Sequence, residues 1–223
     1  MEREHISTSF DIELGQLKQN ILIMGGKVEL MISNSIKSLV DRDTPLAEHT
    51  IALDHEINAA EVEIDECCLE LLALRQPTAR DLRFITIALK IVTDLERMGD
   101  QCANIAKRAR ELNEEPPLKP YIDIPRMAQR TEAMLKEALD AFVSGDADLA
   151  VKVCKEDNFV DDLNIQIQRE LLTYMIEDPT TISRAMKLNY ISKSLERIAD
   201  HATNVAEMVI FMVKGKDIRH TIV

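Results

Sequence analysis

The stretch Asp94-Leu-Glu-Arg-Met-Gly-Asp-Gln-Cys-Ala-Asn-Ile-Ala-Lys107 returns almost unchanged as Ser194-Leu-Glu-Arg-Ile-Ala-Asp-His-Ala-Thr-Asn-Val-Ala-Glu207. In both copies the apolar residues recur in alternating steps of three and four, which is typical of a helix packed lengthwise against other helices. The chain is therefore a tandem repeat, and these two lines anchor the alignment of its halves. Leu39–Ala47 and Phe142–Ala150 extend the alignment toward the start of each half.

Outward from these lines, the same periodicity predicts six long helices and no strands. Thr44 is the predicted N-cap of the second helix, with Pro45 at its first position. Short connections make neighbouring helices antiparallel, so each half is an up-down-up unit. The predicted fold is all-α, with two tandem, pseudo-symmetric three-helix bundles. The first covers residues 1–113, a segment with four prolines links them at 114–125, and the second covers 126–223.

Composition narrows the class of partner. The 223 residues carry a formal net charge of −12, so a phosphate backbone would be repelled and nucleic acid is not expected as a partner. Cations and basic protein surfaces are better candidates. The sequence has no uninterrupted apolar run long enough to span a membrane and no apolar signal core at its start, which predicts a cytoplasmic protein. The four cysteines show no paired spacing and are expected to be reduced packing residues.

Acidic side chains recur at related positions in both halves. Glu96 and Asp100 stand four residues apart, which places both carboxylates on one face of a helix and away from the apolar stripe. Oxygen ligands without Cys or His favour hard cations such as Mg²⁺, Mn²⁺, Ca²⁺ or iron, which makes this a candidate site for a divalent or trivalent metal. The candidate ligands are Asp54, Asn58, Glu96 and Asp100 in the first half, and Asp157, Asp161, Glu196 and Asp200 in the second.

Other interpretations of these features stay open. The acidic stripes are either cation sites or a solvated face, and His201 is either a supplementary ligand or a solvated side chain. The charges of Arg80–Arg83 form either a local salt-bridge cluster or a contact surface. No phosphate loop or nucleophile motif indicates an enzyme. A metal-dependent enzyme, a metal buffer and a metal-free helical scaffold remain as alternatives to a regulatory role.

The doubled L-E-R-x-x-D-x-x-x-N line, Pro77-Thr-Ala-Arg-Asp-Leu-Arg83 and the ending Gly215-Lys-Asp-Ile-Arg-His220 together resemble the PhoU family of phosphate-transport accessory and regulatory proteins. The resemblance covers essentially the whole chain. It implies a cytoplasmic, often dimeric, all-α protein that represses the phosphate-starvation regulon when phosphate is plentiful, and the leading hypothesis is a regulatory adaptor that is not an enzyme. The implied partners are the ATPase side of the phosphate ABC transporter and the sensor histidine kinase, at the inner face of the membrane.

The resemblance also bears on the acidic positions. The family pattern E(D)-x-x-x-D is associated with surface metal clusters, and it matches Glu96/Asp100, Glu196/Asp200 and Asp157/Asp161. Asp54 matches the remaining copy, but Asn58 stands in place of the second acid. The first-half site is therefore expected to carry less charge and to bind more weakly.

Overall fold

The computed structural model describes residues 8–215, and across this range the chain forms α-helices joined by short turns. The all-α prediction is confirmed. The sequence motif that continues from Gly215 to His220 lies, beyond its first residue, outside the described residues. The elements are α1 (Thr8–Val40), α2 (Thr44–Leu74), α3 (Ala79–Asn113), α4 (Asp123–Ser144), α5 (Ala147–Glu177), the 3-10 helix η1 (Pro179–Thr181) and α6 (Ile182–Lys214).

The turns between helices follow from local side-chain chemistry. Asp43, and not Thr44, is the N-cap of α2: its carboxylate accepts a hydrogen bond from the Leu46 backbone N–H at 2.9 Å. An Asp one residue upstream can make the same capping bond, so the predicted cap was wrong by one position. The equivalent Asp146 caps α5 in the same way. Gly145, before it, has φ of 68°, a left-handed conformation that suits a residue without a Cβ.

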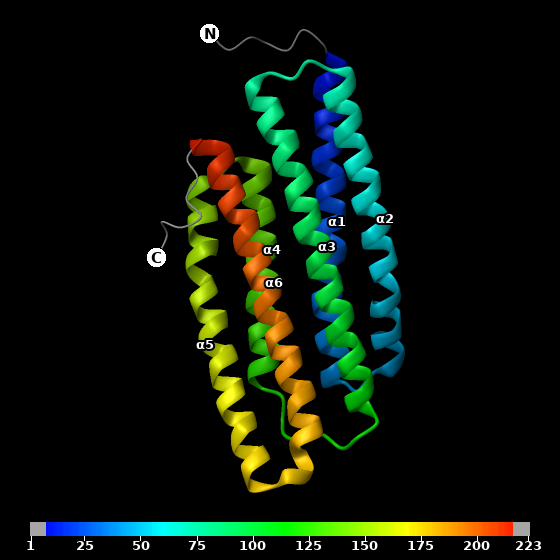
Figure 1. The fold of residues 1–223 in the computed structure, drawn as a ribbon, viewed down its shortest axis with the longest axis vertical. Coiled ribbons are helices and arrows are strands. Elements are labelled where there is room, and N and C mark those ends of the chain that lie inside the picture. The colour runs from blue at the N-terminus through cyan, green and yellow to red at the C-terminus, as the bar shows by residue number, and fades with distance from the viewer. Residues whose placement is uncertain (1–7, 216–223) are drawn as a thin grey trace.

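The six helices make two three-helix units that lie side by side (Figure 1). Helix α2 packs on α1 and α3, and α5 packs on α4 and α6, while α1 contacts α4 and α3 contacts α6 across the centre. Figure 1 shows that α3 and α6 run in opposite directions. An approximate two-fold axis therefore passes between α3 and α6, and it confirms the predicted pseudo-symmetric pair of bundles.

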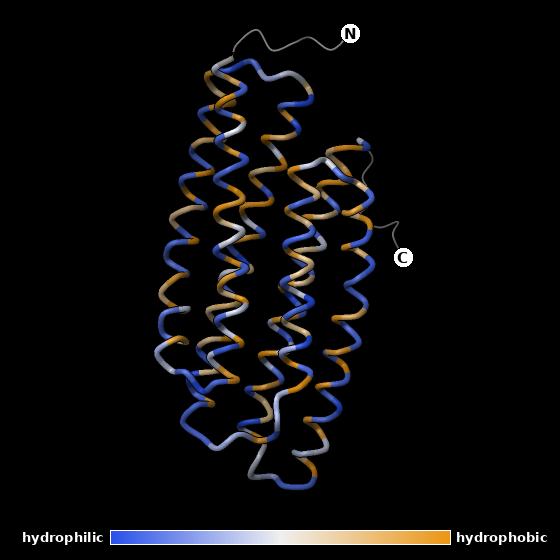
Figure 2. Tube along the Cα trace, turned by 180° about the vertical axis from the view of Figure 1, so that it is seen from behind, coloured by the Kyte–Doolittle hydropathy of each residue, from blue (hydrophilic) through white to orange (hydrophobic). Residues whose placement is uncertain are grey.

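One continuous apolar core joins both units. The stripes predicted for α3 and α6 are buried, as are Leu17, Ile21 and Met24 of α1, so the three-and-four spacing identified the inward faces. Hydrophobic and hydrophilic segments alternate along the helices in Figure 2. At Gly25 a Cβ would lie 2.3 Å from the Leu139 side chain, and this close approach brings α1 against α4.

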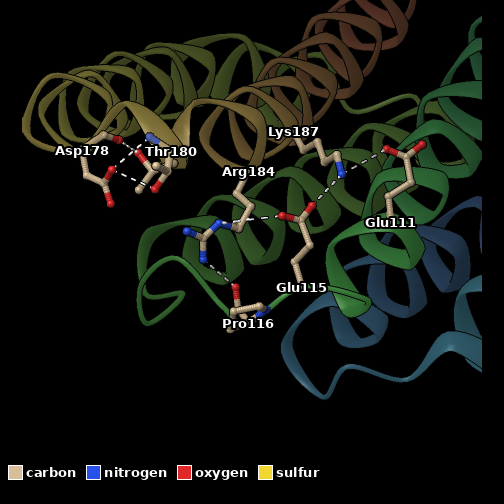
Figure 3. A network of polar contacts seen from close by, with 8 residues as sticks. Glu111, Glu115, Pro116, Asp178, Thr180, Arg184 and Lys187 are labelled. Carbon is tan, nitrogen blue, oxygen red and sulfur yellow. Dashed lines mark hydrogen bonds and ion pairs between the residues drawn. The ribbon is translucent and has the colours of Figure 1, made fainter.

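A polar network ties the proline-rich segment to the start of α6 (Figure 3). The Lys187 ammonium lies 3.0 Å from a carboxylate oxygen of Glu115 and 3.8 Å from one of Glu111. Arg184 donates a hydrogen bond to the Pro116 carbonyl at 3.0 Å. Both cations come from the second half, and their partners come from the end of α3 and from the proline-rich segment, so the network fixes one end of the junction between the units.

Candidate functional site: two acidic grooves

The first acidic groove lies between α2 and α3 and contains Asp54, Asn58, Glu61, Glu96 and Asp100. Burial, and next the charge of Asp100, raise the pKa of Asp54 above its ordinary value. Burial and the charges of Asp100, Glu61 and Asp54 raise the pKa of Glu96. The carboxylates from the two helices therefore sense one another across the groove, and their mutual repulsion is an unfavourable feature that a cation would relieve.

Glu61 is a member of this groove that was not among the candidate ligands, although Glu61 and Asp65 also stand four residues apart on α2. Burial and neighbouring acids, among them Asp65 and Asp100, raise its pKa, and it in turn raises the pKa of Glu96. Glu61 lies one turn beyond Asn58 on α2 and supplies the negative charge that Asn58 lacks. Glu61 adds an acid to the first groove, and the weaker binding expected of the first-half site stays a prediction. The four nearby acids of the first groove match the number in the second half.

The second acidic groove lies between α5 and α6 and contains Asp157, Asp161, Glu196 and Asp200. Burial, followed by the charges of Asp200, Asp161 and Glu196, raises the pKa of Asp157 to about 6. Burial and the charge of Glu196 also raise the pKa of Asp161 and of Asp200. Lys193, one turn before Glu196, pairs with the Glu196 carboxylate at the edge of the groove. The predicted residues of each half thus come together in one groove per half.

Both grooves lie outside the apolar core, although their acids are not freely solvated. Asp100 and Asp200 are exposed, and Asp54, Asn58, Asp157 and Asp161 are half-buried between paired helices. This partial burial explains why desolvation is the largest cause of the raised pKa values. The predicted exterior placement is correct, with the added feature that several of these acids are half-buried where two helices pack together.

The donor chemistry of the grooves suits a hard cation. Buried side-chain oxygens of Asp54, Asn58 and Asp157 have no hydrogen-bond partner within the described part of the chain. Such unpaired oxygens are costly and are commonly satisfied by water or an ion. As the side chains stand, no three His, Cys, Asp or Glu groups among the described residues converge on one point that could hold a metal ion. A bound cation would have to draw the carboxylates together.

The seam between α3 and α6 carries a contact that the sequence did not reveal. His201 Nδ1 lies 2.7 Å from a carboxylate oxygen of Asp94, and the Asn204 amide donates to the same oxygen at 3.4 Å. The side chains of His201 and Asp94 are only 18% and 9% exposed, so the interpretation of His201 as a solvated side chain was wrong. A cavity of about 570 Å³ opens beside Asp94 and Asn204. Asn204 therefore contributes to the contact between α3 and α6 and not to the neighbouring acidic groove.

Two other sequence features have structural roles. Asp81, within Arg80–Arg83, accepts a hydrogen bond from the Thr78 backbone N–H at 3.2 Å and caps the start of α3. All four cysteines are free and at least half-buried, and burial raises the pKa of Cys68 to about 12 and that of Cys154 to about 11. These thiols are poor nucleophiles at neutral pH. In residues 8–215, no helix has the length and apolar character needed to cross a membrane.

Comparisons with known proteins agree with the repeated architecture. The PhoU domain model matches the chain twice, at residues 21–109 and 124–209. A Pseudomonas aeruginosa protein named phosphate-specific transport system accessory protein PhoU homolog is 44% identical over 97% of this chain and 90% of its own length. The Escherichia coli protein named phosphate-specific transport system accessory protein PhoU is 37% identical over the same shares of the two chains.

Solved structures show the same fold. The crystal structure of PhoU from Pseudomonas aeruginosa superimposes with a TM-score of 0.90 at 43% identity, covering 93% of this chain and 100% of the other. The phosphate transport system regulatory protein PhoU from Streptococcus pneumoniae gives a TM-score of 0.87 at 32% identity, covering 93% of this chain and 98% of the other. With two domain matches, whole-length relatives and a shared six-helix architecture, the chain belongs to the PhoU family.

Proposed function

We propose that this protein is a cytoplasmic regulator of phosphate uptake and a negative regulator of the phosphate-starvation regulon. The observation that carries this proposal is whole-length similarity to proteins named as accessory or regulatory components of phosphate transport. The similarity extends through both halves, since the domain model matches each of them. The protein acts in this proposal by binding, without catalysing a reaction.

The proposed partners are the ATPase side of the phosphate ABC transporter and the sensor histidine kinase of the phosphate two-component system. An adaptor between them works at the inner face of the membrane without inserting into it. The supporting features are a rigid helical scaffold with one continuous core and a formal charge of −12 that favours basic protein surfaces. We also propose that the protein forms a homodimer, which sedimentation velocity would test directly.

The acidic grooves are the proposed cation sites. Asp54, Glu61, Glu96 and Asp100 would hold a divalent or trivalent ion in the first groove, with Asn58 as a neutral oxygen donor. Asp157, Asp161, Glu196 and Asp200 would do so in the second. Bound Mg²⁺, Mn²⁺ or iron would neutralise repelling carboxylates, and these donors contain no soft ligand that would exclude such ions.

Deletion of the gene tests the regulatory proposal. The expected result is expression of a phosphate-starvation reporter in phosphate-rich medium, with repression restored by a plasmid that carries the wild-type gene. Reporter expression that stays low after deletion would remove the proposed role. A protein that represses the reporter and shows no catalytic activity fits the proposal. Turnover of a phosphate ester that is lost in the Glu196→Gln, Asp200→Asn variant would instead support the enzyme hypothesis.

Metal analysis of purified protein tests the grooves separately. Glu196→Ala with Asp200→Ala should remove the metal of the second groove and leave the helical circular dichroism spectrum intact, because neither side chain belongs to the apolar core. Glu66→Ala with Glu70→Ala is the matched control, since both acids are exposed and four residues apart on α2. Equal metal content in the two variants would contradict a site in the second groove.

A further inference from the structure

A cavity of about 790 Å³ opens at one end of the molecule, between the two halves. Its walls come from the starts of α1 and α3 and from the ends of α4 and α6, which lie near one another in Figure 1. Cavities of roughly 300–1,000 Å³ are typical of small-molecule sites. None of the lining residues belongs to either acidic groove, so this cavity is a separate candidate site.

Basic side chains line one part of the cavity, although the protein as a whole has a net charge of −12. They are Lys18 of α1 and Arg80 and Arg83 of α3. Two acids, Asp11 and Asp81, also line it, and Asp81 caps the start of α3. Within residues 8–215, no ion pair joins the half-buried Lys18 or Arg83 to a carboxylate. The walls therefore carry more positive than negative charge, and two of the cations can receive an anion.

The remainder of the cavity wall is largely apolar. Leu14 and Met212 line it, and behind them the rings of Phe84 and Phe142 stack with centroids 5.4 Å apart. The Lys18 ammonium lies 5.3 Å from the Phe84 ring centroid, which is within the range of a cation–π contact. This contact positions the Lys18 charge where the apolar and basic parts of the wall meet. The cavity thus suits an anion that carries an apolar body.

The opposite end of the molecule shows what fills the equivalent position there. Alignment of the halves places residues 114–121 of the proline-rich segment where residues 11–18 of α1 stand, and the start of α6 where α3 starts. In that segment Glu115 pairs with Lys187 at 3.0 Å, and Leu118 packs against the apolar core (Figure 3). A carboxylate and an apolar side chain of the same chain therefore occupy the equivalent position, whereas the cavity beside α1 is open.

We propose that this cavity binds a small phosphomonoester with an apolar body. Its phosphate lies between Lys18 and Arg83, and its body lies against Leu14 and Met212. A phosphomonoester carries about two negative charges near neutral pH, and a guanidinium can bind it in a bidentate manner. Inorganic phosphate would leave the apolar wall uncovered, and a carboxylate would offer a single charge to the two cations. The proposal goes beyond the proposed function and does not depend on the transport partners or on a bound metal.

Isothermal titration of the full-length protein tests the ligand class. The probes are phenyl phosphate, inorganic phosphate and benzoate at pH 8 and low salt, with chelator present so that no probe binds through a groove cation. Phenyl phosphate should bind at least about tenfold more tightly than the other two, because only it combines a dianion with an apolar body. No binding of phenyl phosphate, or equal binding of all three probes, would overturn the proposal.

Neutralising a lining cation tests the place of binding. Arg83→Gln should weaken the binding of phenyl phosphate about tenfold or more, because it removes one of the two cations that contact the phosphate. Arg110→Gln is the matched control, since Arg110 is an exposed arginine in the last turn of the same helix. Wild-type affinity in Arg83→Gln, or an equal loss in both variants, would overturn the assignment of the cavity.

An acid introduced into the cavity provides a second, independent variant. Gly15 lines the cavity, and a Cβ placed on it would meet no atom within 4 Å. Gly15→Asp should therefore place a carboxylate in the binding space without a clash and weaken phenyl phosphate binding about tenfold or more. Gly26→Asp is the control, because Gly26 belongs to the same helix, also has open space around it and lies outside the cavity. Equal affinity of the two variants would overturn the proposal, and circular dichroism verifies the fold of each.

Discussion

The two acidic grooves reach a similar charge by different residues. The first uses Glu61 where the second has Asn164, and Asn58 where the second has Asp161. The basic side chains near the grooves differ as well. Lys107 limits the rise in the pKa of Asp54 in the first groove, whereas its counterpart in the second half is Glu207. Lys193 pairs with Glu196 in the second groove, where the first half has Thr93. The halves therefore preserve a groove with clustered carboxylates and not a fixed list of positions.

The largest effect is expected where the halves differ most, at the seam. His201→Ala should lower the free energy of unfolding by about 2–3 kcal/mol, because it leaves the nearly buried Asp94 carboxylate with only the 3.4 Å contact to Asn204. Gln101→Ala, at the equivalent position of α3, is the matched control and should change stability much less. Urea unfolding measures both. Equal losses would show that the contact contributes no more than ordinary packing.

A pH experiment separates the second groove from the first. The pKa of Asp157 is about 6 in the folded protein and about 4 when unfolded, so the folded state binds more protons between these values. Stability should therefore fall as pH rises through this window. With chelator present, Asp157→Asn should be about 1–2 kcal/mol more stable than wild type at pH 7, after allowance for water screening.

Urea unfolding at pH 4.5 and pH 7 checks this expectation, and the stabilisation should shrink at the lower pH. Asp54→Asn is the comparison from the first groove. Burial also raises the pKa of Asp54, but Lys107 opposes that rise, so a smaller gain is expected. A larger gain in stability from Asp54→Asn than from Asp157→Asn would contradict the expectation that burial of a carboxylate costs more in the second groove.

Glu61 can be tested as the substitute for the missing acid. In a background of Glu196→Gln with Asp200→Asn, which disables the second groove, Glu61→Gln should weaken Mn²⁺ binding about tenfold, equivalent to about 1.4 kcal/mol. Glu63→Gln is the control, because Glu63 is an exposed acid of the same helix. Isothermal titration gives both affinities. Unchanged affinity in Glu61→Gln would support the expectation of a charge-poor first groove.

The smallest effect concerns the turns that the halves build differently. Gly145 and its counterpart Arg42 both have positive φ, but Arg42 also donates a hydrogen bond to the Asn113 carbonyl at 2.5 Å. Gly145→Ala should therefore lower stability by about 1 kcal/mol through backbone strain. Thermal unfolding at fixed pH measures the loss, with Gly26→Ala in α1 as a control at a helical glycine that has open space around it. A stabilised Gly145→Ala variant would contradict the strain argument.

The fold was predictable because its signals are local. Apolar residues in three-and-four steps identified the buried faces, and Pro77 and the Asp178-Pro179 pair marked helix ends. Periodicity states which side of a helix is buried, but it does not identify the opposing helix. The packing of α3 on α6 and the approach of α1 to α4 at Gly25 therefore emerged only from the structure.

The sequence predicted which acidic residues lie near one another in each half, but it did not predict the contacts around them. Spacing brought Glu196 with Asp200 onto one helix face, and alignment of the halves placed Asp157 on the neighbouring helix. The Asp94–His201 contact joins residues 107 positions apart, and neither residue follows a local pattern that would pair them. Glu61 was not among the candidate ligands because the alignment of the halves places Asn164, and not an acid, at the equivalent position.

The Asp94–His201 contact has no mirror image, because Ser194 and Gln101 stand at the equivalent positions. This contact therefore breaks the approximate two-fold symmetry at the centre of the molecule, although its two halves are nearly equal. Two identical subunits of a partner that bind across α3 and α6 would become inequivalent, because each would contact a different half of this protein. NMR resonances or chemical reactivities of the two partner subunits that coincide before binding should then split into two sets. A regulator of this shape could act on one partner subunit at a time.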